Sequence, residues 1–424
     1  MAVNQQPIPL SEAQGMILST VGPLPVVRVA LPEACGYVLA ESIKADHDIP
    51  MFDRSYMDGY AVKAADTVEA QPKRPVVLQV IEEIPAGHVP QREVRDGTAS
   101  RIMTGAPIPL GADAVIRVEE TQRDEEGEQE VVRLFSPVSP GEAIGRRGED
   151  VRCGEELLTR GHLIGPVELG LLATFGVPSV PVFRKPRVGI LSTGSELLPV
   201  EQEVEPGKIR NSNSYMLAGA VRQAGGDPVL FGFVEDELGL LAQRMAEALE
   251  QVDVLVTSGG VSMGAYDLVG KAYDRIGAEA VFWKALIRPG MPVLYGLRQG
   301  KPIFSLAGNP ASSYVNAWLF LLPALRRMAG MPQALPQPVQ AVCEDEVEAK
   351  PMRHMRFLRG FAYTEKGSLR VRLAQSQSSG VLSSFLGCNC LARVPGGIGY
   401  RSGELIEVEL MGGVGTHSPV QAFR

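Results

Sequence analysis

The sequence lacks the features that mark membrane-spanning, secreted and nucleic-acid-binding proteins. None of its apolar runs reaches the ~18 residues of a membrane span, and AWLFLLPAL at 317–325, with Pro323 inside it, predicts a short buried helix with a kink. The start, MAVNQQPIPLSEAQ, has neither the basic residues nor the apolar core of a signal peptide, so we expect a cytoplasmic location and no membrane partner. With 41 Lys and Arg against 49 Asp and Glu, and no basic stripe among aromatics, the sequence disfavours a nucleic-acid partner.

Signatures of metal and nucleotide binding are also missing. The five cysteines form no CxxC pair and leave an odd thiol, which indicates a reducing compartment. Cys388 and Cys390 fit two small residues of a strand better than a metal clip. The five histidines form no HxxxH or HExxH pattern, so a histidine-bound zinc site has no support. Neither GxxxxGK[ST] nor GxGxxG occurs, which argues against Walker A and dinucleotide-binding turns.

The length and composition are those of a globular protein of several domains. For 424 residues, with 45% hydrophobic and 21% charged residues, we expect two to four domains. From about 46 to 180, short β-type runs alternate with Gly/Pro turns, which predicts antiparallel β-structure with DEEGEQE at 124–130 as a hairpin tip. After PQALPQP at 332–338, the segment 339–424 predicts a small β-domain.

Between about 185 and 330 the sequence alternates strand and helix patterns. Three apolar runs end in glycine turns, at 187–197, 252–262 and 301–313. Helical patterns separate them, at 214–226 and 238–251. Such alternation predicts a parallel sheet with helices on both faces.

Capping residues predict where several helices begin. Ser11 and Gln14 have capping-box spacing, which predicts a helix over 11–20. The run at 31–45 also has apolar residues at helical intervals, and Asn213 suits the N-cap of the helix that follows it.

The glycine turns are candidates for binding an oxyanion. In an open α/β sheet, ligands bind beyond the carboxyl ends of the strands, where glycine lets backbone N–H groups approach an anion closely. A single turn of this kind indicates only a tight connection, whereas three in one sheet favour a site for phosphate or another oxyanion. The substrate-binding residues predicted on this basis are Ser192, Thr193, Gly194, Ser258, Gly259, Gly260, Ser262, Gly308, Asn309 and Pro310.

Charged residues follow the same turns. Glu196 comes after the first turn, Asp236 after the strand FGFVE, and Asp267 after the second turn. Carboxylates beside phosphate-binding turns predict Mg²⁺, a hard cation that bridges carboxylate and phosphate oxygens. Lys284 and Arg288, in VFWKALIRPGMP, would neutralise the remaining phosphate charge. Any one of these charges fits a solvated ion pair as well as a site, and only their shared location favours the site.

Seven ordered segments resemble a known family. They are SYMDGYAV, RIMTGAPIP, GILSTGSEL, IRNSNSYML, VTSGGVSMGAYD, FWKALIRPGMP and LAGNPASS. Together, over about 7–410, they resemble the molybdopterin molybdenumtransferase family, which in animals forms the C-terminal half of gephyrin. The resemblance implies an α/β and β multidomain fold: an α/β domain of three layers like that of molybdopterin adenylyltransferase, segment-swapped and inserted β-rich domains, and a C-terminal β-barrel. The implied boundaries are 1–26 plus 185–331, 27–45 plus 140–184, 46–139, and 332–424.

The resemblance also implies an activity and a set of functional residues. The family transfers molybdenum from molybdate to adenylylated molybdopterin, with Mg²⁺-dependent release of AMP, during molybdenum cofactor biosynthesis. Its members are homodimers whose active site joins one subunit's α/β domain to the other's inserted domain, and the molybdopterin adenylyltransferase is a further candidate partner. The family's motifs assign metal and substrate phosphate to Asp267, Asp236 and Glu196, charge neutralisation to Lys284 and Arg288, and action from the partner subunit to Asp58 and Thr104.

The sequence departs from the family pattern at a few positions. The family usually reads K-x-x-x-K-P-G-K-P, whereas Arg288 and Met291 stand at its second and third lysines. Arg288 keeps the charge, while Met291 removes a cation and leaves the molybdate site less defined. Ser195 is a mild change in the STG-x-E motif. Arg356 and Ser379, in RFLRG and SSGVLSS, are weaker candidates for binding molybdate or pterin.

Two other functions and a second metal stay open at this point. A molybdopterin adenylyltransferase would need only the α/β domain, and the additional MDGYA and MTGAP segments argue against it. A gephyrin-like scaffold is disfavoured because we see no fused domain or long linker. Tungstate could replace molybdate, since the two oxyanions are nearly identical in size and charge, and the sequence does not separate them.

Overall fold

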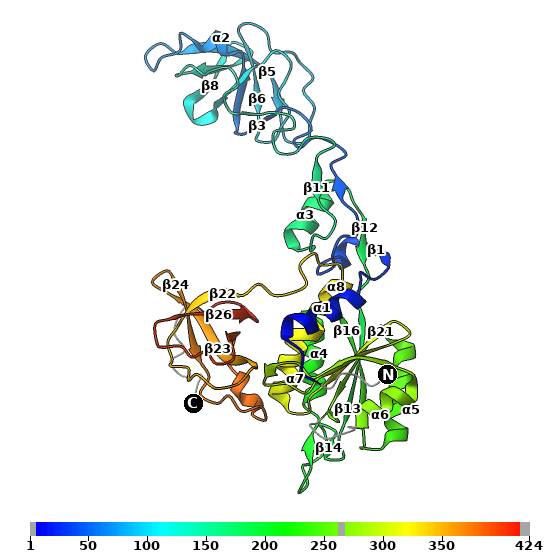
Figure 1. Cartoon of the computed structure of the whole chain (residues 1–424). Coiled ribbons are helices and arrows are strands. Elements are labelled where there is room, and N and C mark those ends of the chain that lie inside the picture. Colours follow the sequence, from blue (N-terminus) through cyan, green and yellow to red (C-terminus); the bar gives the residue numbers. More distant parts are fainter. Residues whose placement is uncertain (1–5, 262–267, 416–424) are drawn as a thin grey trace. The chain divides into compact units, whose positions relative to one another are not determined.

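The computed structural model describes residues 6–261 and 268–415 (Figure 1). The chain divides into two compact units. The first comprises Met1–Glu41, Arg160–Gly170 and Pro178–Arg424, and the second comprises Ser42–Thr159 and Leu171–Val177. The finer division into four domains stays a prediction. Among the helices of the described residues, none is long and apolar enough to cross a membrane.

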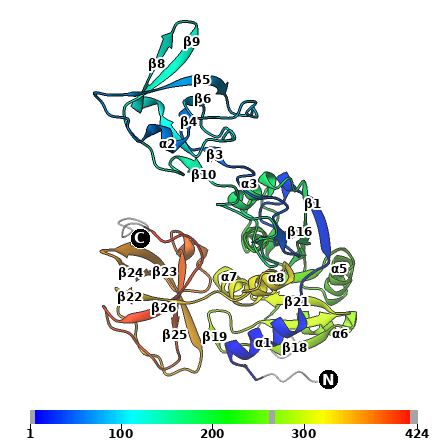
Figure 2. The same ribbon diagram turned by 90° about the horizontal axis from the view of Figure 1, so that it is seen from above.

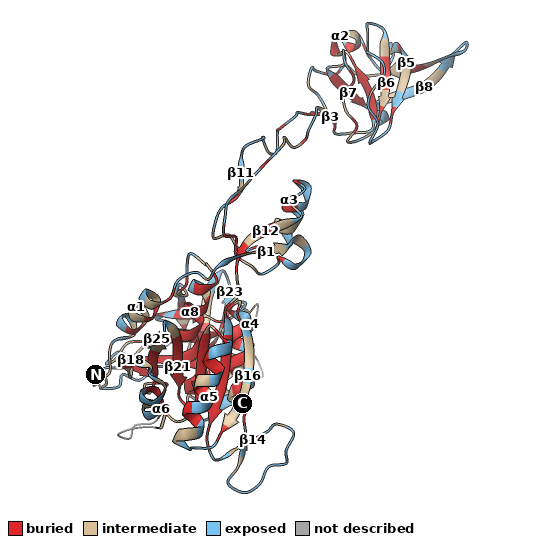
Figure 3. Cartoon of the chain, turned by 90° about the vertical axis from the view of Figure 1, so that its right-hand side faces the viewer, coloured by how far each residue is buried: buried red, intermediate tan, exposed pale blue. Residues whose placement is uncertain are grey.

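The first unit contains a six-stranded sheet in the order β16-β13-β17-β21-β20-β18. Its strands are β13 (Arg187–Thr193), β16 (Asp227–Val234), β17 (Val254–Ser258), β18 (Glu279–Trp283), β20 (Leu294–Arg298) and β21 (Lys301–Leu306). The four neighbours β16, β13, β17 and β21 run parallel, as predicted. Strands β13, β17 and β21 are largely buried, as Figure 3 shows, whereas β16 at the edge is mostly half-buried or exposed.

The sheet also has an antiparallel edge, which the sequence did not predict. Strand β20 pairs antiparallel with both β21 and β18. Only Gln299 and Gly300 separate β20 from β21, and both have positive φ, at 51° and 78°. Two residues with positive φ form the hairpin turn that matches the twist of antiparallel strands. A connection this short cannot return the chain to a parallel position.

Helices cover both faces of this sheet, as predicted. They are α1 (Leu10–Thr20), α4 (Asn213–Gln223), α5 (Leu238–Gln251), α6 (Leu268–Ile276), α7 (Pro310–Asn316) and α8 (Leu322–Met328). Val188 and Val254 belong to a core shared with α1, α4 and α8, whereas Leu191 and Leu255 belong to a second core shared with α5 and α6. Because side chains alternate along a strand, each strand contributes to both cores.

Three local predictions need correction. Helix α1 begins at Leu10 after Pro9, without a side-chain cap, so Ser11 is not its cap. The run at 31–45 forms only the 3₁₀ turn η1 (Leu31–Glu33) and the strand β2 (Ile43–Lys44). Val38 and Leu39 instead form isolated bridges with the distant residues Leu163 and Val182. Asn213 is the first residue of α4 and makes no capping bond; its side chain points elsewhere.

The segment around Pro323 is a buried helix, as predicted, with a local irregularity. A π-helical turn, η3 (Ala317–Leu321), lies between α7 and α8. Every residue of this turn is buried. Proline lacks the N–H of a regular helix, and widened turns are among the usual ways in which helices accommodate such an interruption.

The C-terminal part of the first unit is a closed β-barrel, as predicted. Its strands are β22 (Val339–Cys343), β23 (Met355–Glu365), β24 (Ser368–Leu373), β25 (Cys390–Val394) and β26 (Leu405–Leu410), with the 3₁₀ turn η4 (Leu382–Phe385). The order β23-β24-β22-β26-β25 closes through the pairing of β25 with β23. Helix α7 lies between the sheet and this barrel (Figures 1 and 2).

Direct contacts join the barrel to the α/β core. Phe357, Leu391 and Met411 belong to the same core as α1 and α8. The indole N–H of Trp318 donates to Glu409 Oε2 at 2.7 Å, and Glu409 is 4% exposed. Strand β19 (Ile287–Arg288) pairs in parallel with the start of β23. The first unit is therefore packed continuously from sheet to barrel.

The second unit is β-rich, as predicted. A six-stranded sheet has the order β7-β4-β6-β5-β9-β8, in which only β5 and β6 are parallel. Its strands are β4 (Gly59–Val62), β5 (Val76–Ile84), β6 (Thr98–Ile102), β7 (Ala114–Arg117), β8 (Thr121–Glu126) and β9 (Gln129–Leu134). Hairpin β8–β9 confirms the predicted tip. Shorter elements are β3 (Arg54–Ser55), α2 (Ala64–Thr67), η2 (Val118–Glu120), β10 (Ile144–Gly145) and β11 (Glu156–Leu158).

The remaining elements are short. They are β1 (Val26–Ala30), α3 (Pro166–Thr174), β12 (Ser179–Phe183), β14 (Leu197–Leu198) and β15 (Ile209–Arg210). Strand β1 pairs antiparallel with β12, and β14 pairs in parallel with β15.

Candidate active site

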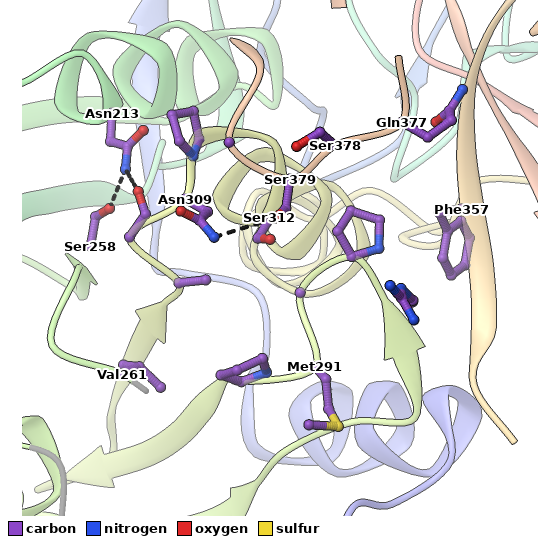
Figure 4. Close-up of a pocket in the computed structure, with 18 of the residues that line it drawn as sticks. Asn213, Ser258, Val261, Met291, Asn309, Ser312, Phe357, Gln377, Ser378 and Ser379 are labelled. Carbon is purple, nitrogen blue, oxygen red and sulfur yellow. Dashed lines mark hydrogen bonds between the residues drawn. The ribbon is translucent and has the colours of Figure 1, made fainter. Parts of the chain in front are cut away.

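The three predicted glycine turns meet at one end of the sheet. Strands β13, β17 and β21 are direct neighbours, so their carboxyl ends lie side by side. Beyond these ends is a cavity of about 1630 Å³, called the strand-end pocket below. Its wall is completed by the start of α4, the loop at 287–292, and barrel segments that include 345–348 and 377–380. Figure 4 shows Asn213, Met291 and Gln377 from three of these segments.

Most of the predicted site residues line this pocket. They are Ser192, Thr193, Gly194, Glu196, Asp236, Ser258, Gly259, Gly260, Arg288, Gly308, Asn309 and Pro310, together with the weaker candidates Arg356 and Ser379. Ser262 and Asp267 lie outside the described residues. Lys284 is not among the residues that line the pocket, and Asp58 and Thr104 belong to the second unit.

The glycines allow the strand ends to approach each other closely. Gly259 has a φ of 95°, and a Cβ atom on it would lie 2.1 Å from the backbone oxygen of Thr193. A Cβ on Gly194 would lie 2.4 Å from Glu196 Oε2. A side chain at Gly259 would therefore separate β17 from β13, and one at Gly194 would displace the Glu196 carboxylate.

Two carboxylates lie along one side of the pocket. The Thr193 hydroxyl donates to Asp236 Oδ1 at 2.9 Å, and the Ser195 N–H donates to Asp236 Oδ2 at 3.4 Å. Glu196 lies against Gly194, as its distance to that residue's Cβ position shows. Two carboxylates and nearby hydroxyls are oxygen ligands of the kind that suits a Mg²⁺ ion that keeps several waters. Among the described residues, no three His, Cys, Asp or Glu side chains gather to enclose a metal by themselves.

Two arginines lie on the barrel side. Arg288 and Arg356 are paired residues of the parallel strands β19 and β23, and both line the pocket. Arg356 is 5% exposed; its Nη2 donates to the Ile398 carbonyl at 2.7 Å, and its buried Nε has no partner among the described residues. Burial lowers the pKa of the Arg356 guanidinium; Glu348 opposes that shift and Arg288 adds to it. Arginine nevertheless remains cationic, so this side can hold an oxyanion.

Lys284 was expected to neutralise phosphate charge together with Arg288, whereas Met291 was expected to remove a cation. The Lys284 ammonium lies 5.3 Å from the centre of the Trp283 ring, and its backbone N–H donates to Val293 at 2.9 Å. Met291 lines the pocket, and its sulfur is 3.2 Å from His354 Nε2. Of the three positions at which the family pattern has lysine, occupied here by Lys284, Arg288 and Met291, only Arg288 brings a permanent charge into the pocket.

Asp58 and Thr104 lie together in the second unit. The backbone N–H and the hydroxyl of Thr104 donate to Asp58 Oδ1 at 2.7 and 2.8 Å. These two hydrogen bonds, that of the backbone first, lower the pKa of Asp58 from its usual value. The two loops that carry the MDGYA and MTGAP motifs are thus held to each other by the residues that the family pattern singles out.

Sequence reasoning missed several lining residues. Arg210, Asn211 and Asn213 come from IRNSNSYML, a marker of resemblance in which Asn213 was assigned only an N-cap role, and Lys350 and Gln377 come from the barrel. The concentration of Asn and Ser before α4 was a usable signal, because short polar side chains favour bonds to backbone groups. The barrel residues had none, since only the closure of the fold brings them to the strand ends.

This geometry defines an α/β protein with a pocket beyond glycine-rich strand ends and an attached β-barrel, and comparisons with known proteins specify it further. Residues 189–327 match the family model of a probable molybdopterin binding domain. Residues 8–176 match the MoeA N-terminal region (domain I and II), and residues 340–411 match the MoeA C-terminal region (domain IV).

Full-length relatives agree with these matches. The molybdopterin molybdenumtransferase of Bacillus subtilis is 39% identical over 416 residues, which cover 97% of this chain and 96% of that protein. The Staphylococcus aureus (strain N315) enzyme of the same name is 35% identical over 409 residues, 96% of each chain. A crystal structure of the molybdopterin biosynthesis moeA protein from Pyrococcus horikoshii OT3 superposes with a TM-score of 0.80, at 35% identity, over 96% of this chain and 100% of that one.

The chain therefore belongs to the molybdopterin molybdenumtransferase family. It is a transferase of molybdenum cofactor biosynthesis. The resemblance seen in the seven sequence motifs and the multidomain fold that it implied are both confirmed.

Proposed function

We propose that the strand-end pocket binds adenylylated molybdopterin and molybdate, and that the enzyme transfers molybdenum to the substrate with Mg²⁺-dependent release of AMP. One observation carries this proposal. The three glycine strand ends line a single pocket whose lining also includes Glu196 and Asp236, beside the end of β13, and Arg288 and Arg356, on the paired strands β19 and β23. A phosphoanhydride substrate and a second oxyanion need carboxylates that hold a metal ion and cationic side chains that neutralise the remaining negative charge.

The chain's residues would act mainly by positioning and by neutralising charge. The turns at Gly194, Gly259 and Gly308 bring the backbone close to the substrate phosphates. Glu196 and Asp236 would hold Mg²⁺, which supplies positive charge to the phosphoanhydride that breaks. In the balanced reaction, water adds across that anhydride to release AMP. Two Mo–S bonds form while one molybdate oxygen leaves with the two thiol protons as water.

Arg288 and Arg356 are the proposed ligands of molybdate. Their paired register on β19 and β23 places both guanidinium groups on one wall. The unpartnered Nε of Arg356 is a buried donor whose bond an oxyanion could complete. Tungstate has the same shape and charge, so the pocket offers no basis for rejecting it.

The proposed activity is tested directly with purified protein. We expect AMP release from adenylylated molybdopterin that requires both Mg²⁺ and molybdate. Asp236→Asn should lower the rate at least about tenfold, the equivalent of about 1.4 kcal/mol, because it removes one metal-binding charge. Asp274→Asn, a change at an exposed aspartate of α6, is the matched control. Equal rates for wild type and Asp236→Asn would refute the carboxylate assignment; adenylylation of unmodified molybdopterin from ATP, without AMP release, would favour the adenylyltransferase.

We further propose that the enzyme is a homodimer in which Asp58 and Thr104 complete the partner subunit's pocket. Their mutual hydrogen bonds and their separate unit in the chain support this arrangement. Asp58→Ala and Asp236→Ala should each be inactive. After the two are unfolded and refolded together, one of two sites in each mixed dimer is complete, so roughly a quarter of wild-type activity should return. Mixed dimers without activity would contradict the proposal.

A further inference from the structure

A short polar segment before and at the start of α4 contacts all three strand ends. This segment, residues 211–214, has the sequence Asn-Ser-Asn-Ser and is called the NSNS segment below. At the end of β13, the Ser192 hydroxyl donates to Asn211 Oδ1 at 3.2 Å and lies 3.0 Å from Ser214 Oγ. Ser192 and Ser214 are 1% and 2% exposed, so these bonds lie in the interior, where they are not exchanged for water.

Asn213 connects the other two strand ends. Its Nδ2 donates both to Ser258 Oγ, at the end of β17, at 2.9 Å and to the Gly308 carbonyl, beyond β21, at 2.7 Å (Figure 4). The side-chain amide carries two N–H groups on one planar nitrogen, and both find an acceptor. One side chain thus spans the gap between the two turns.

The ladder of the sheet does not extend into these turns. The paired register of β17 and β21 stops at Ser258 and Leu306, so Gly260 and Gly308 lie beyond it. One backbone bond, from Gly259 N–H to Leu306 at 3.2 Å, holds the start of the turn. The position of Gly308 relative to β17 therefore depends strongly on Asn213.

We propose that the NSNS segment is a positioning device, with Asn213 at its centre, that sets the spacing of the three turns and thereby the affinity of the pocket for its substrate. The catalytic part of this inference rests on the proposed function. Asn213 acts through Ser258 and Gly308, and no other residue type supplies its two donors at that length: aspartate supplies none, and alanine leaves both acceptors unpaired.

Two substitutions of Asn213 should change the distance between the turns at Ser258 and Gly308 to different extents. In Asn213→Asp, a carboxylate oxygen stands 2.7 Å from the Gly308 carbonyl oxygen in place of a donor, and repulsion should move the turn outward. Asn213→Ala only removes the two bonds. Tyr215→Ala, at an exposed residue of α4 two positions further on, is the matched control.

The first measurement needs no substrate. Hydrogen exchange of the segments 258–261 and 306–309 should be faster in both Asn213 variants, and faster in Asn213→Asp than in Asn213→Ala, with wild-type exchange in Tyr215→Ala. Unchanged exchange at these turns in both variants would overturn the inference whatever reaction the pocket performs.

The second measurement is the kinetics of AMP release. Loss of two ordinary hydrogen bonds that hold the turns corresponds to about a tenfold effect, so KM for the adenylylated substrate should rise about tenfold in Asn213→Ala and further in Asn213→Asp. A lower Tm with unchanged KM would mean that Asn213 only stabilises α4, and would refute the positioning role. Failure of the wild type to release AMP would refute the proposed function instead, while the exchange result would still decide the role of the NSNS segment.

Discussion

Replacing Gly259 by alanine should force apart the ends of β13 and β17. The new Cβ would lie 2.1 Å from the Thr193 oxygen, whereas real Cβ atoms essentially never come within 3.0 Å of another heavy atom. The obstacle is backbone, so it cannot rotate away, and one strand end must shift by about 1 Å. A misplacement of about 1 Å at a catalytic centre can lower the rate about 100-fold.

The same substitution should also destabilise the fold. The φ of 95° lies in the left-handed region, which costs an L-residue about 1–2 kcal/mol. Forced displacement in a packed interior adds about 1–3 kcal/mol. A loss of this size should lower Tm by about 4 °C or more in a domain of this size.

A glycine elsewhere in the same domain provides the control. Gly219, in the middle of α4, has no atom within 4 Å of its Cβ position. Gly219→Ala should stabilise the protein by about 0.5–1 kcal/mol and leave AMP release unchanged. Thermal unfolding and the AMP assay compare the two variants. A Gly259→Ala protein with wild-type Tm and rate would show that the strand ends are not as closely packed as the reasoning requires.

Three further changes probe the arginine wall and the contact between barrel and sheet. Arg356→Gln should raise the KM for molybdate about tenfold and leave AMP binding unchanged, because it removes the buried cation; a change confined to AMP binding would reassign that side chain. Met291→Lys should lower the KM for molybdate, since it adds a cation to the lining, and an unchanged KM would place the oxyanion elsewhere. Burial raises the pKa of Glu409 despite the bond from Trp318, so the stability that this group contributes is complete below the pKa of the unfolded chain and is lost as pH rises through the folded-state pKa. The free energy of unfolding, measured with urea, should therefore fall less between pH 5 and pH 8 in Glu409→Gln than in the wild type. An equal fall in the two proteins would contradict this.

Much of the α/β sheet could be predicted from local pattern. The strands β13, β17 and β21 are apolar runs that end in small residues, and both features are visible within a few positions of the chain. Short-range signals failed where distant partners decided the outcome. The run at 31–45 has a helical period, yet Leu39 bridges to Val182 and the helix does not form. Capping rules predicted that the Asn213 side chain caps α4. Instead, it donates hydrogen bonds to Ser258 and Gly308 at two neighbouring strand ends.

The candidate site divides in the same way. The place of the glycines, Glu196 and Asp236 in the pocket could be predicted, because glycine turns and nearby carboxylates are recognisable in the sequence as candidates for binding an oxyanion and a metal. Lys284 was expected beside them because it belongs to the segment VFWKALIRPGMP and to the family's FWK motif. The backbone at Lys284 has a φ of 77° and its ammonium lies near Trp283, so proximity in sequence did not become proximity in the pocket.

By itself, the sequence determined the family, the α/β and β composition of the chain, and many of the residues that line the strand-end pocket, because each of these is carried by short motifs with local physical causes. Only the tertiary structure decided that three strand ends are direct neighbours, that the barrel contributes Arg356 to their pocket, and that Asn213 spans two of them. The physical reason is that register, strand order and domain packing depend on contacts between residues far apart in the chain, for which no local pattern exists.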